Sequence, residues 1–247
     1  MCGRFGLTRP DKLDLRRFGV TSLPELPPRF NVAPGTDILV VRERKSEREA
    51  SLIRWGLVPW WAENPSIGAR MANARSDSAF SRFREPMRQR RCLIPADVFY
   101  EWQVVAGRKT KQPYAVALKD SEVFALGGIW DYWKPKSDGE GVVTCAILTT
   151  EPNTLLTPIH DRMPVIVPPD RYSAWLDPTT PEPAVRDLVK PFPSEAMAAW
   201  PISLRVNKAT EDNVRILQPV EEAPEPGELE LPLGDASTSS APHRRGG

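Results

Sequence analysis

Proline is the residue that most restricts what this chain can fold into. The 247-residue sequence contains 27 prolines and only 15 glycines. Proline lacks a backbone N–H and fixes its own φ, so it interrupts helix interiors and is excluded from the centre of sheets. Such a sequence favours many short elements joined by loops over a bundle of long helices. Apolar runs are also short, as at residues 38–41, and we therefore expect no transmembrane helix.

Short β-rich runs separated by turn signals dominate the pattern. Strands are predicted at residues 38–42, 50–55, 91–94, 99–104, 114–118, 123–129, 142–148 and 164–167. Helical patterns are fewer and are predicted at residues 11–18, 76–89, 170–175 and 183–189. Because strands and helices do not alternate regularly, we predict a single α+β domain, residues 1–220, built around a largely antiparallel sheet.

The C-terminal residues differ in composition from the rest of the chain. Residues 221–247 carry six acidic side chains, two arginines and no aromatic residue. Such a segment buries too little apolar surface to offset the entropy lost on ordering, so we predict a disordered tail. The whole chain has a formal net charge of +1, but residues 1–220 contain 31 basic and 26 acidic side chains. The near-neutral total therefore hides a mildly basic body.

Cysteine usage indicates a compartment. The three cysteines, at positions 2, 92 and 145, are an odd number without metal-binding spacing, which favours a reducing compartment. The first residues lack the apolar segment of a secretory signal, so we expect a cytoplasmic protein. With one histidine in residues 1–220, we expect no metal site and no cofactor. Cys92 and Cys145 lie in apolar runs and are expected to be inert core thiols.

Cys2 directly follows the initiator methionine. Removal of Met1 would leave a cysteine with a thiol and a free α-amine, whose reference pKa values are about 8.5 and about 7.7–8.0. Such an aminothiol condenses with an aldehyde to an imine, and its thiol then closes on the same carbon to form a thiazolidine. The ring closure is intramolecular and benefits from a high effective molarity. The alternative is a cysteine without a role on a frayed terminus, but the structured look of Gly3-Arg4-Phe5-Gly6 favours the first interpretation.

His160 is the only histidine in residues 1–220 and lies in a polar loop end beside Asp161 and Arg162. A lone histidine is more often a structural residue than a catalyst. Polar loop ends between prolines, however, are a common setting for function. His160 is therefore a candidate functional residue.

Glu101 lies in a strand-like run of aromatic residues. Strand alternation places Phe99 and Glu101 on one face, and Tyr100 and Trp102 on the other. The Glu101 carboxylate is either an edge-strand charge or a partly buried acid with a raised pKa. The pattern leaves both interpretations open.

Residues 70–91 contain seven arginines against two acidic residues. Asn73 and Arg75 lie at the beginning of this segment, and Trp60 and Trp61 are close by in sequence. Basic residues interleaved with aromatic ones suit a groove for single-stranded nucleic acid, where arginine binds phosphate and tryptophan stacks on bases. A solvated helix face is the commoner outcome for such a charge run. The two tryptophans could equally belong to the core, although alternation turns at least one of them outward.

Six blocks of the sequence carry these candidates and follow one another in a fixed order. They are Met1-Cys2-Gly3-Arg4-Phe5, Phe30-Asn31-Val32-Ala33-Pro34, Trp55-Gly56-Leu57, Asn73-Ala74-Arg75, Phe99-Tyr100-Glu101-Trp102 and Ile159-His160-Asp161-Arg162-Met163-Pro164. Together with residues 206–220, which look like a closing segment, they resemble the SOS response-associated peptidase family. Members of this family are abasic-site processing proteins that cross-link to single-stranded DNA.

The resemblance implies a fold and a chemistry. The expected fold is a single domain with a largely antiparallel, barrel-like sheet and short peripheral helices. Cys2 is implied to capture the open-chain aldehyde of an abasic site as a thiazolidine, and Glu101 to move protons during imine formation and ring closure. His160 is implied to assist opening of the deoxyribose ring, and Asn73 to orient the N-terminal residue or the opened sugar.

The resemblance also implies a DNA-binding surface. Arg4, Arg75 and Arg162 are expected to hold phosphates, and Trp60 and Trp61 to wedge the bent strand. The expected partner is single-stranded DNA with abasic sites, bound by a monomer without metal or membrane, in the cytoplasm and at the nucleoid when engaged. The family site also removes an N-terminal extension autocatalytically, but here ordinary methionine removal would suffice. The imine further allows β-elimination, a lyase side reaction.

Three alternatives come from other functional classes. N-terminal-nucleophile amidohydrolases also begin Met-Cys-Gly, but their downstream glutamine- and oxyanion-site motifs are not identifiable here. A papain-like protease using Cys2, His160 and Asn73 lacks a secretory context. A non-catalytic single-strand binder would leave Cys2 incidental. Replacing Cys2 by alanine separates these alternatives, because only a covalent mechanism loses its cross-link.

Overall fold

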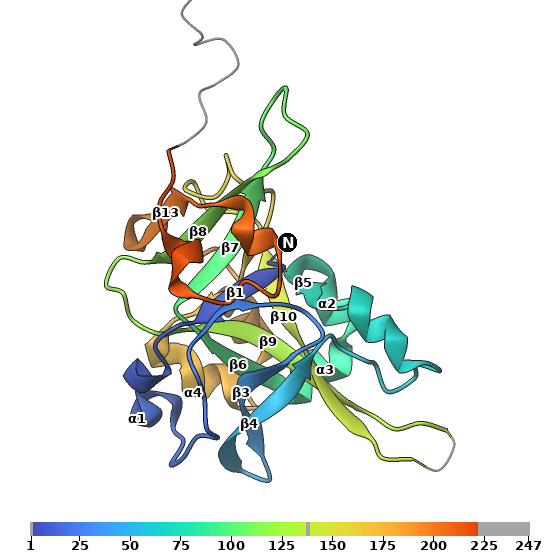
Figure 1. Ribbon diagram of the computed structural model, residues 1–247. Coiled ribbons are helices and arrows are strands. Elements are labelled where there is room, and N and C mark those ends of the chain that lie inside the picture. Colours follow the sequence, from blue (N-terminus) through green and yellow to red (C-terminus); the bar gives the residue numbers. More distant parts are fainter. Residues whose placement is uncertain (1, 137–138, 222–247) are drawn as a thin grey trace, which may run out of the picture.

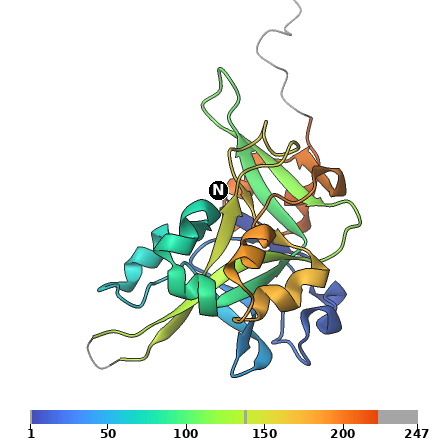
Figure 2. The same cartoon turned by 180° about the vertical axis from the view of Figure 1, so that it is seen from behind.

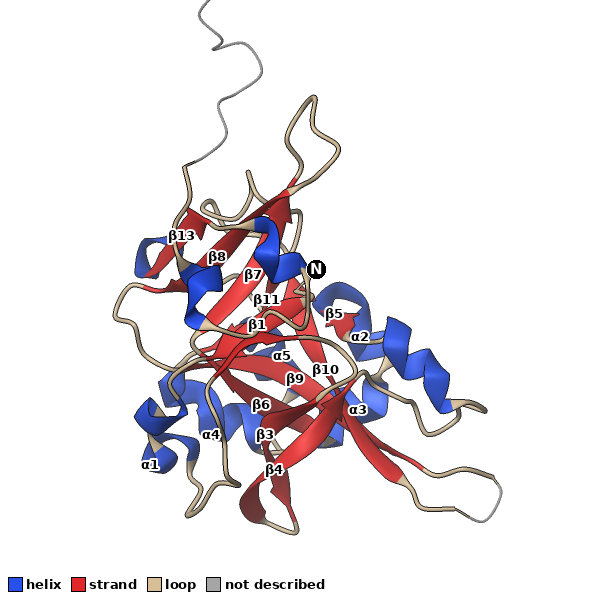
Figure 3. Ribbon diagram, in the orientation of Figure 1, coloured by secondary structure: helices blue, strands red, loops and turns tan. Residues whose placement is uncertain are grey.

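Two sheets form the framework of the protein in a computed structural model that describes residues 2–136 and 139–221 (Figures 1 and 3). The smaller sheet is antiparallel throughout. Its strand order is β13 (Met197–Pro201), β8 (Gln112–Leu118), β7 (Val98–Gln103), β1 (Arg4–Leu7) and β2 (Arg29–Val32). The predicted tail begins at Glu221, and its other residues lie outside the described part of the chain.

The larger sheet closes into a barrel. Its strand order is β11 (Met163–Pro164), β10 (Val142–Thr150), β4 (Glu47–Trp55), β3 (Asp37–Arg44), β6 (Arg91–Ala96), β9 (Phe124–Trp133) and β12 (Ile166–Val167), with β5 (Asn73–Arg75) added to β10. A further pairing of β10 with β9 closes the circle β10-β4-β3-β6-β9. β10 runs parallel to β4 and β5, and the other pairings are antiparallel. The predicted α+β class with a largely antiparallel, barrel-like sheet is confirmed.

The strands of the barrel are buried on both faces, which explains the uninterrupted apolar run in β3. Ile38 and Val40 belong to the same core cluster as Phe99 of the smaller sheet. Leu39 and Val41 belong to a second cluster, on the opposite side of the strand. A strand covered on both sides reads as a continuous apolar run because neither set of alternating side chains faces water.

Short helices cover the outer face of the barrel (Figure 2). They are α1 (Leu15–Phe18), α2 (Ser76–Arg82), α3 (Arg84–Gln89), α4 (Tyr172–Leu176) and α5 (Glu182–Leu188). Their apolar residues, such as Phe18, Met87 and Trp175, complete the second cluster. Single 3₁₀ turns occupy Pro10–Lys12, Pro65–Arg70, Pro169–Arg171, Ser194–Ala196, Leu204–Asn207 and Val214–Leu217. None of the helices in the described residues is long and apolar enough to cross a membrane.

Proline and capping residues divide two of the predicted helices. The helix predicted at residues 76–89 is interrupted at Phe83, where φ is −122° and ψ is 42°. In a continuous helix the ring of Pro86 would collide with the carbonyl of Arg82, so the chain restarts as α3. The helix predicted at 11–18 is reduced to a 3₁₀ turn and α1, because the Asp14 side chain accepts from the amides of Arg16 and Arg17 and begins a new helix there.

The predicted strands are mostly found in the structure. Seven of the predicted strands correspond to β3, β4, β6, β7, β8, β9 and β10. The strand predicted at residues 164–167 is divided, because β11 pairs with β10 and β12 pairs with β9. β1, β2, β5 and β13 were not predicted as strands. β1 lies between β7 and β2, so the chain begins inside a sheet.

Candidate active site

Cys2 lies two residues before β1 and is completely buried. Its Sγ donates a weak hydrogen bond to the carbonyl of Arg4 at 3.7 Å. Its own carbonyl accepts from Nδ2 of Asn73 at 2.9 Å. Asn73 opens β5, which is held beside β10 with Asn73 opposite Ile147. The two sheets therefore meet at Cys2, and the interpretation of a frayed terminus is wrong.

Glu101 is also fully buried. It lies in β7, which is flanked by β8 and β1, so it is not an edge-strand charge. Phe99 belongs to the same core cluster as Cys2, whereas Tyr100 and Trp102 pack on the opposite face, as alternation predicts. Burial raises the pKa of the Glu101 carboxyl to about 7. The second sequence interpretation, a buried acid with a raised pKa, is the one that the structure adopts.

Burial and the neighbouring Glu101 also raise the pKa of the Cys2 thiol. The thiol is therefore protonated at neutral pH and needs a base before it can act as a nucleophile. Glu101, whose own pKa is near neutrality, is the acidic group close enough to influence it.

His160 reaches the same place from the loop between β10 and β11. Its Nε2 lies 3.8 Å from Oε2 of Glu101. Its Nδ1 accepts a hydrogen bond from the backbone N–H of Arg162 at 3.0 Å and lies 2.8 Å from Oδ1 of Asp161. Burial lowers the pKa of His160, and the charge of Lys111 acts in the same direction. The imidazole is therefore neutral at physiological pH.

The loop that carries His160 is anchored at several points. Asn153 accepts from the amide of Leu156 and donates to the carbonyl of Phe192 at 2.7 Å. Gln103, at the end of β7, donates to the carbonyl of Pro158 at 3.2 Å. The bond from Gln103 fixes the loop to the strand that carries Glu101, and the bond from Asn153 to Phe192 fixes the start of the loop to the segment before β13. Cys2, Asn73, Glu101 and His160 thus lie in one place, and the catalytic roles expected of them stay predictions.

Of the residues predicted to contact DNA, three have exposed side chains and two have side chains bonded within the protein. Trp60 and Trp61 follow β4 and expose 69% and 56% of their surface, so both face outward. The Arg75 side chain is 57% exposed and lies 2.9 Å from Oδ2 of Asp77. None of these three is joined to the catalytic cluster by a direct contact within the described residues.

Arg4 and Arg162 use their guanidinium groups within the protein. Arg4 donates to Oδ1 of Asn31 at 2.8 Å and to the carbonyl of Val206 at 2.9 Å. Arg162 is 8% exposed and donates to the carbonyl of Thr149 at 2.6 Å. Only part of each donor set remains for a phosphate, and that role stays a prediction.

Sequence reasoning gave no role to three polar residues around the site. Asn31 holds Arg4, Asp77 holds Arg75, and Lys111 contributes charge to His160. Asn31 lies within one of the six sequence blocks of the family resemblance, and Asp77 follows Arg75 by two positions, so the sequence could have pointed to both. Lys111 lies in the loop before β8, and no sequence pattern pointed to it.

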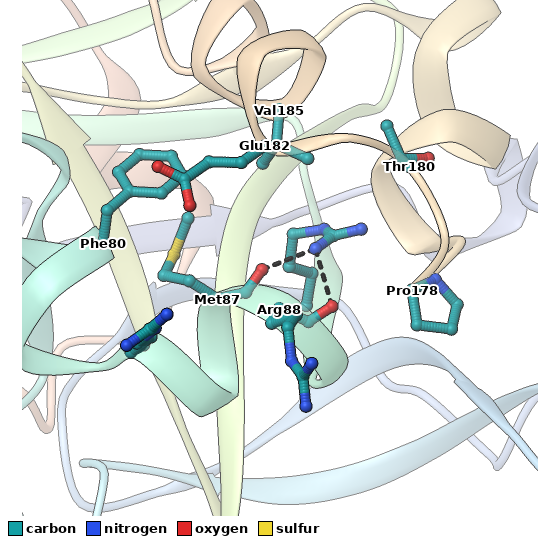
Figure 4. A pocket seen from close by; sticks show the side chains of 9 residues that line it. Phe80, Met87, Arg88, Pro178, Thr180, Glu182 and Val185 are labelled. Atoms are coloured by element: carbon teal, nitrogen blue, oxygen red, sulfur yellow. Dashed lines mark hydrogen bonds between the residues drawn. The ribbon is translucent and has the colours of Figure 1, made fainter.

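Two cavities lie near functional candidates or basic residues. One, of about 570 Å³, is lined by His160, Asp161, Trp102 and Lys111 and adjoins the site. Another, of about 260 Å³, lies between α3 and α5 and contains none of the predicted site residues (Figure 4). Cys92 and Cys145 are buried as predicted, and within the described residues no three metal-binding side chains gather.

Comparisons with known proteins point in one direction. The profile of the family described as SOS response associated peptidase (SRAP) matches residues 1–209. The abasic site processing protein YoqW of Bacillus subtilis is 37% identical over 224 residues, which cover 88% of this chain and 99% of that protein. The abasic site processing protein HMCES of Gallus gallus is 32% identical over 228 residues, covering 78% and 67%. A solved structure from Bacteroides thetaiotaomicron superposes with a TM-score of 0.76 at 27% identity, covering 90% and 98%.

Proposed function

The chain belongs to the SOS response associated peptidase family, and we propose that it processes abasic sites in single-stranded DNA by linking them covalently to Cys2. The observation that carries this proposal is the burial of Cys2 beside Glu101 and His160, with Asn73 bonded to its carbonyl. All four residues come from one chain, so a monomer suffices. The relatives named as abasic site processing proteins support the substrate.

The first step is condensation of the Cys2 α-amine with the C1′ aldehyde of the opened sugar. The amine nitrogen adds to C1′, the carbonyl oxygen takes up a proton, and the resulting carbinolamine loses water to give an imine. Loss of water needs an acid at the departing hydroxyl. With a pKa of about 7, Glu101 is close to half protonated at neutral pH and can donate that proton and take one back.

The second step closes the ring. The Cys2 sulfur adds to C1′, and the thiol proton passes through Glu101 to the imine nitrogen. The raised pKa of the thiol makes this transfer necessary, and a positively charged iminium beside the thiol favours it. The net reaction joins aldehyde and aminothiol to a thiazolidine with release of one water.

His160 and Asn73 serve this chemistry by position. Nδ1 of His160 contacts the backbone N–H of Arg162 and Oδ1 of Asp161, and Nε2 is the nitrogen that faces Glu101. When Nε2 carries a proton, the imidazole can donate it to the ring oxygen of the closed sugar and assist its opening. The bond from Asn73 to the Cys2 carbonyl holds the N-terminal residue against the aldehyde.

The amine must be free for the first step, so Met1 has to be removed. Ordinary methionine removal suffices, and the family's autocatalytic peptidase reaction is a second route to the same terminus. The imine also permits β-elimination of the 3′ phosphate, which would cut the strand. Fast closure by the thiol suppresses that lyase reaction, so we propose that the thiazolidine protects the lesion.

The DNA strand is proposed to lie over Arg75, Trp60 and Trp61. The two indoles are exposed over more than half of their surface, as bases require for stacking. Exposure of large aromatic side chains to water is unfavourable, and a base stacked on them removes part of that exposed apolar surface.

The test is intact-mass spectrometry under denaturing conditions. The protein lacking Met1 is incubated with an oligonucleotide that contains one abasic site, and the expected product has the summed mass of both minus one water. Cys2→Ala keeps the α-amine but not the thiol, so it should yield an adduct only after borohydride reduction of the imine. Glu101→Gln and His160→Ala should slow formation of the wild-type adduct.

Three outcomes would overturn the proposal. The wild-type protein could form no adduct, or Cys2→Ala could form an equally stable adduct without reductant. Met1 removal followed by turnover of glutamine or a peptide, with no DNA adduct, would instead indicate an N-terminal-nucleophile hydrolase.

A further inference from the structure

The hairpin loop between β7 and β8 stands beside the candidate active site. It covers residues 104–111 and projects from the smaller sheet at the top of Figure 1. β7 carries Glu101 three residues before the loop begins, and β8 starts directly after it. The position of the loop is therefore fixed relative to the catalytic residues by the strand pairing from Phe99 to Gln103.

This loop carries three basic side chains and no acidic one. Arg108, Lys109 and Lys111 are all exposed. Within the described residues none of the three forms an ion pair, whereas Arg88 and Arg186, elsewhere on the surface, pair with neighbouring glutamates. Three like charges on one short loop repel one another. A polyanion would relieve that repulsion.

The cavity of about 570 Å³ lies at the base of the same loop. Trp102, Val104 and Pro158 give it apolar surface, Lys111 lies on its basic side, and His160 belongs to both the cavity and the catalytic cluster. Val104 is 73% exposed, which is unusual for a β-branched apolar residue at the end of a strand. The cavity thus combines apolar walls with one cation, Lys111, and one carboxylate, Asp161, which lies 2.8 Å from Nδ1 of His160.

We propose that this loop and cavity bind the DNA strand on the side of the abasic site opposite to Arg75. This inference rests on the proposed function. The nucleotide next to the abasic sugar lies in the cavity, with its sugar and base against Trp102, Val104 and Pro158. Its phosphate contacts Lys111, and Arg108 and Lys109 contact the phosphates that follow.

Strand continuity supports this assignment. An internal abasic site has a nucleotide on each side, so a strand whose lesion reaches Cys2 must leave the site in two directions. Arg75 lies on β5, which belongs to the larger sheet, and Lys111 precedes β8 in the smaller sheet. The basic groups therefore flank the catalytic cluster from both sheets.

The experiment removes the same charge from two hairpins. Arg108→Gln with Lys111→Gln alters the β7–β8 loop, and Arg44→Gln with Lys45→Gln alters the β3–β4 hairpin. Both pairs remove one arginine and one lysine from exposed turns. Each double variant is made in the Cys2→Ala protein, so that equilibrium binding is measured without cross-linking. The probes are oligonucleotides with an abasic site flanked on both sides, only on the 5′ side, or only on the 3′ side.

We expect the β7–β8 variant to lose about five- to tenfold affinity for the doubly flanked probe. Its slope of log K against log salt should fall by about 1.4, since each phosphate contact on a single strand contributes about 0.7. The loss should persist with one singly flanked probe and vanish with the other. The β3–β4 variant should bind like the Cys2→Ala protein.

Several results would overturn the inference. They are equal losses in both hairpin variants, equal losses on both singly flanked probes, or unchanged binding by the β7–β8 variant. Cross-linking by the wild-type protein is measured separately. If it occurs while the β7–β8 variant binds normally, the inference fails and the proposed function stands. If the wild-type protein forms no cross-link, the proposed function fails whatever the hairpin does.

Discussion

Glu101 is a carboxyl group placed inside a sheet between two neighbouring strands, with no surface open to water. Moving an ionised carboxylate into such a place costs free energy, and the group responds by holding its proton to a higher pH. A catalyst that must give and take protons near neutrality benefits from this shift. The same burial lowers stability whenever the carboxyl is ionised.

The cost of the Glu101 charge can be measured as a pH dependence. The folded pKa of about 7, against an ordinary value of 4.5, means that between these values the folded state holds a proton that the unfolded state has lost. The unfolded state then binds fewer protons, so the free energy of unfolding falls as pH rises from about 4.5 to about 7. Each pKa unit corresponds to about 1.4 kcal/mol, so the fall is about 3 kcal/mol.

Urea denaturation of the wild-type protein and of Glu101→Gln at pH 5 and pH 8 checks this. Glutamine has the same shape without an ionisable proton, so the variant should gain about 3 kcal/mol relative to the wild-type protein at the higher pH. Glu47→Gln, at an exposed position in the β3–β4 hairpin, should show no such gain. Parallel pH curves for wild-type and Glu101→Gln would mean that the carboxyl is ionised without cost.

Arg4 and Arg162 show where prediction from sequence stops at the residue scale. The sequence identified both as basic residues near the chemistry, and both do lie beside it. Their guanidinium groups, however, bind carbonyls of Val206 and Thr149. A backbone carbonyl has no residue-specific signal in the sequence, so this use of a side chain cannot be recognised before the fold is known. For Trp60 and Trp61 the sequence left a place in the core open and turned at least one of them outward, whereas both are exposed in the structure.

At the scale of elements, Arg91 joins the ends of two helices. Its guanidinium donates to the carbonyls of Met87 and Arg88 at the end of α3. It also donates to the carbonyls of Trp175 and Asp177 at the end of α4, both at 2.6 Å. Helix C-termini leave such carbonyls without partners inside the helix. A cation at this end also interacts favourably with the helix dipole. Sequence reasoning counted Arg91 among a run of surface arginines, but it is 3% exposed.

Arg91→Ala should therefore destabilise the protein by about 3 kcal/mol, because it leaves four carbonyls near the barrel without their donor. Burial lowers the pKa of Arg91 only to about 10, so its guanidinium stays charged at neutral pH. Arg91→Lys keeps a cationic donor group but offers three N–H donors in place of five. We expect it to recover part of the loss. Chemical denaturation measures both variants.

Arg88→Ala provides the matched control for this prediction. Arg88 and Arg91 both line the cavity of about 260 Å³, but the Arg88 side chain is 67% exposed and, among the described residues, pairs with Glu85 alone, at 3.4 Å. Exposed ion pairs of this kind contribute about 0–1 kcal/mol. If Arg88→Ala costs as much as Arg91→Ala, the carbonyl bonds are not what stabilises these helix ends.

At the scale of the whole molecule, the catalytic cluster is assembled from both sheets. Cys2 and Glu101 come with the smaller sheet, and Asn73 comes with β5 of the larger one. Strand positions followed from local patterns of apolar residues, since alternation and turns are properties of neighbouring positions. The pairing of β10 with both β4 and β9 could not be predicted from such patterns, because it depends on which strands far apart in the sequence lie side by side. The candidate site was identified through the family resemblance, and its geometry required the fold.

Asn31 fastens the closing segment of the chain to the beginning of the fold. Its side chain is 2% exposed, and its Nδ2 donates to the carbonyls of Val206, Lys208 and Glu211 at 3.1, 3.0 and 2.9 Å. Its Oδ1 accepts from Arg4. One amide thus joins β2, β1 and the segment from 206 to 211, and the closing segment covers the outer face of the smaller sheet through Val206 and Ile216.

Asn31→Ala should release this segment before the rest of the protein unfolds. Losing several buried hydrogen bonds costs about 3 kcal/mol, and the cost falls on a segment that is also held by Arg4, through the carbonyl of Val206, and by Asp212, which accepts from the amide of Asn31 at 2.9 Å. Hydrogen exchange should accelerate at residues 202–219 and remain slow in β3, β6 and β9 of the barrel.

Asn31→Asp should accelerate exchange in the same segment, because a carboxylate cannot donate to the three carbonyls. Asn213→Ala, which removes only an exposed cap on the amide of Arg215, should cost about 1 kcal/mol. Uniform acceleration across the barrel in Asn31→Ala would mean that the closing segment and the sheets unfold as one unit, and that Asn31 supports the whole molecule and not one segment of it.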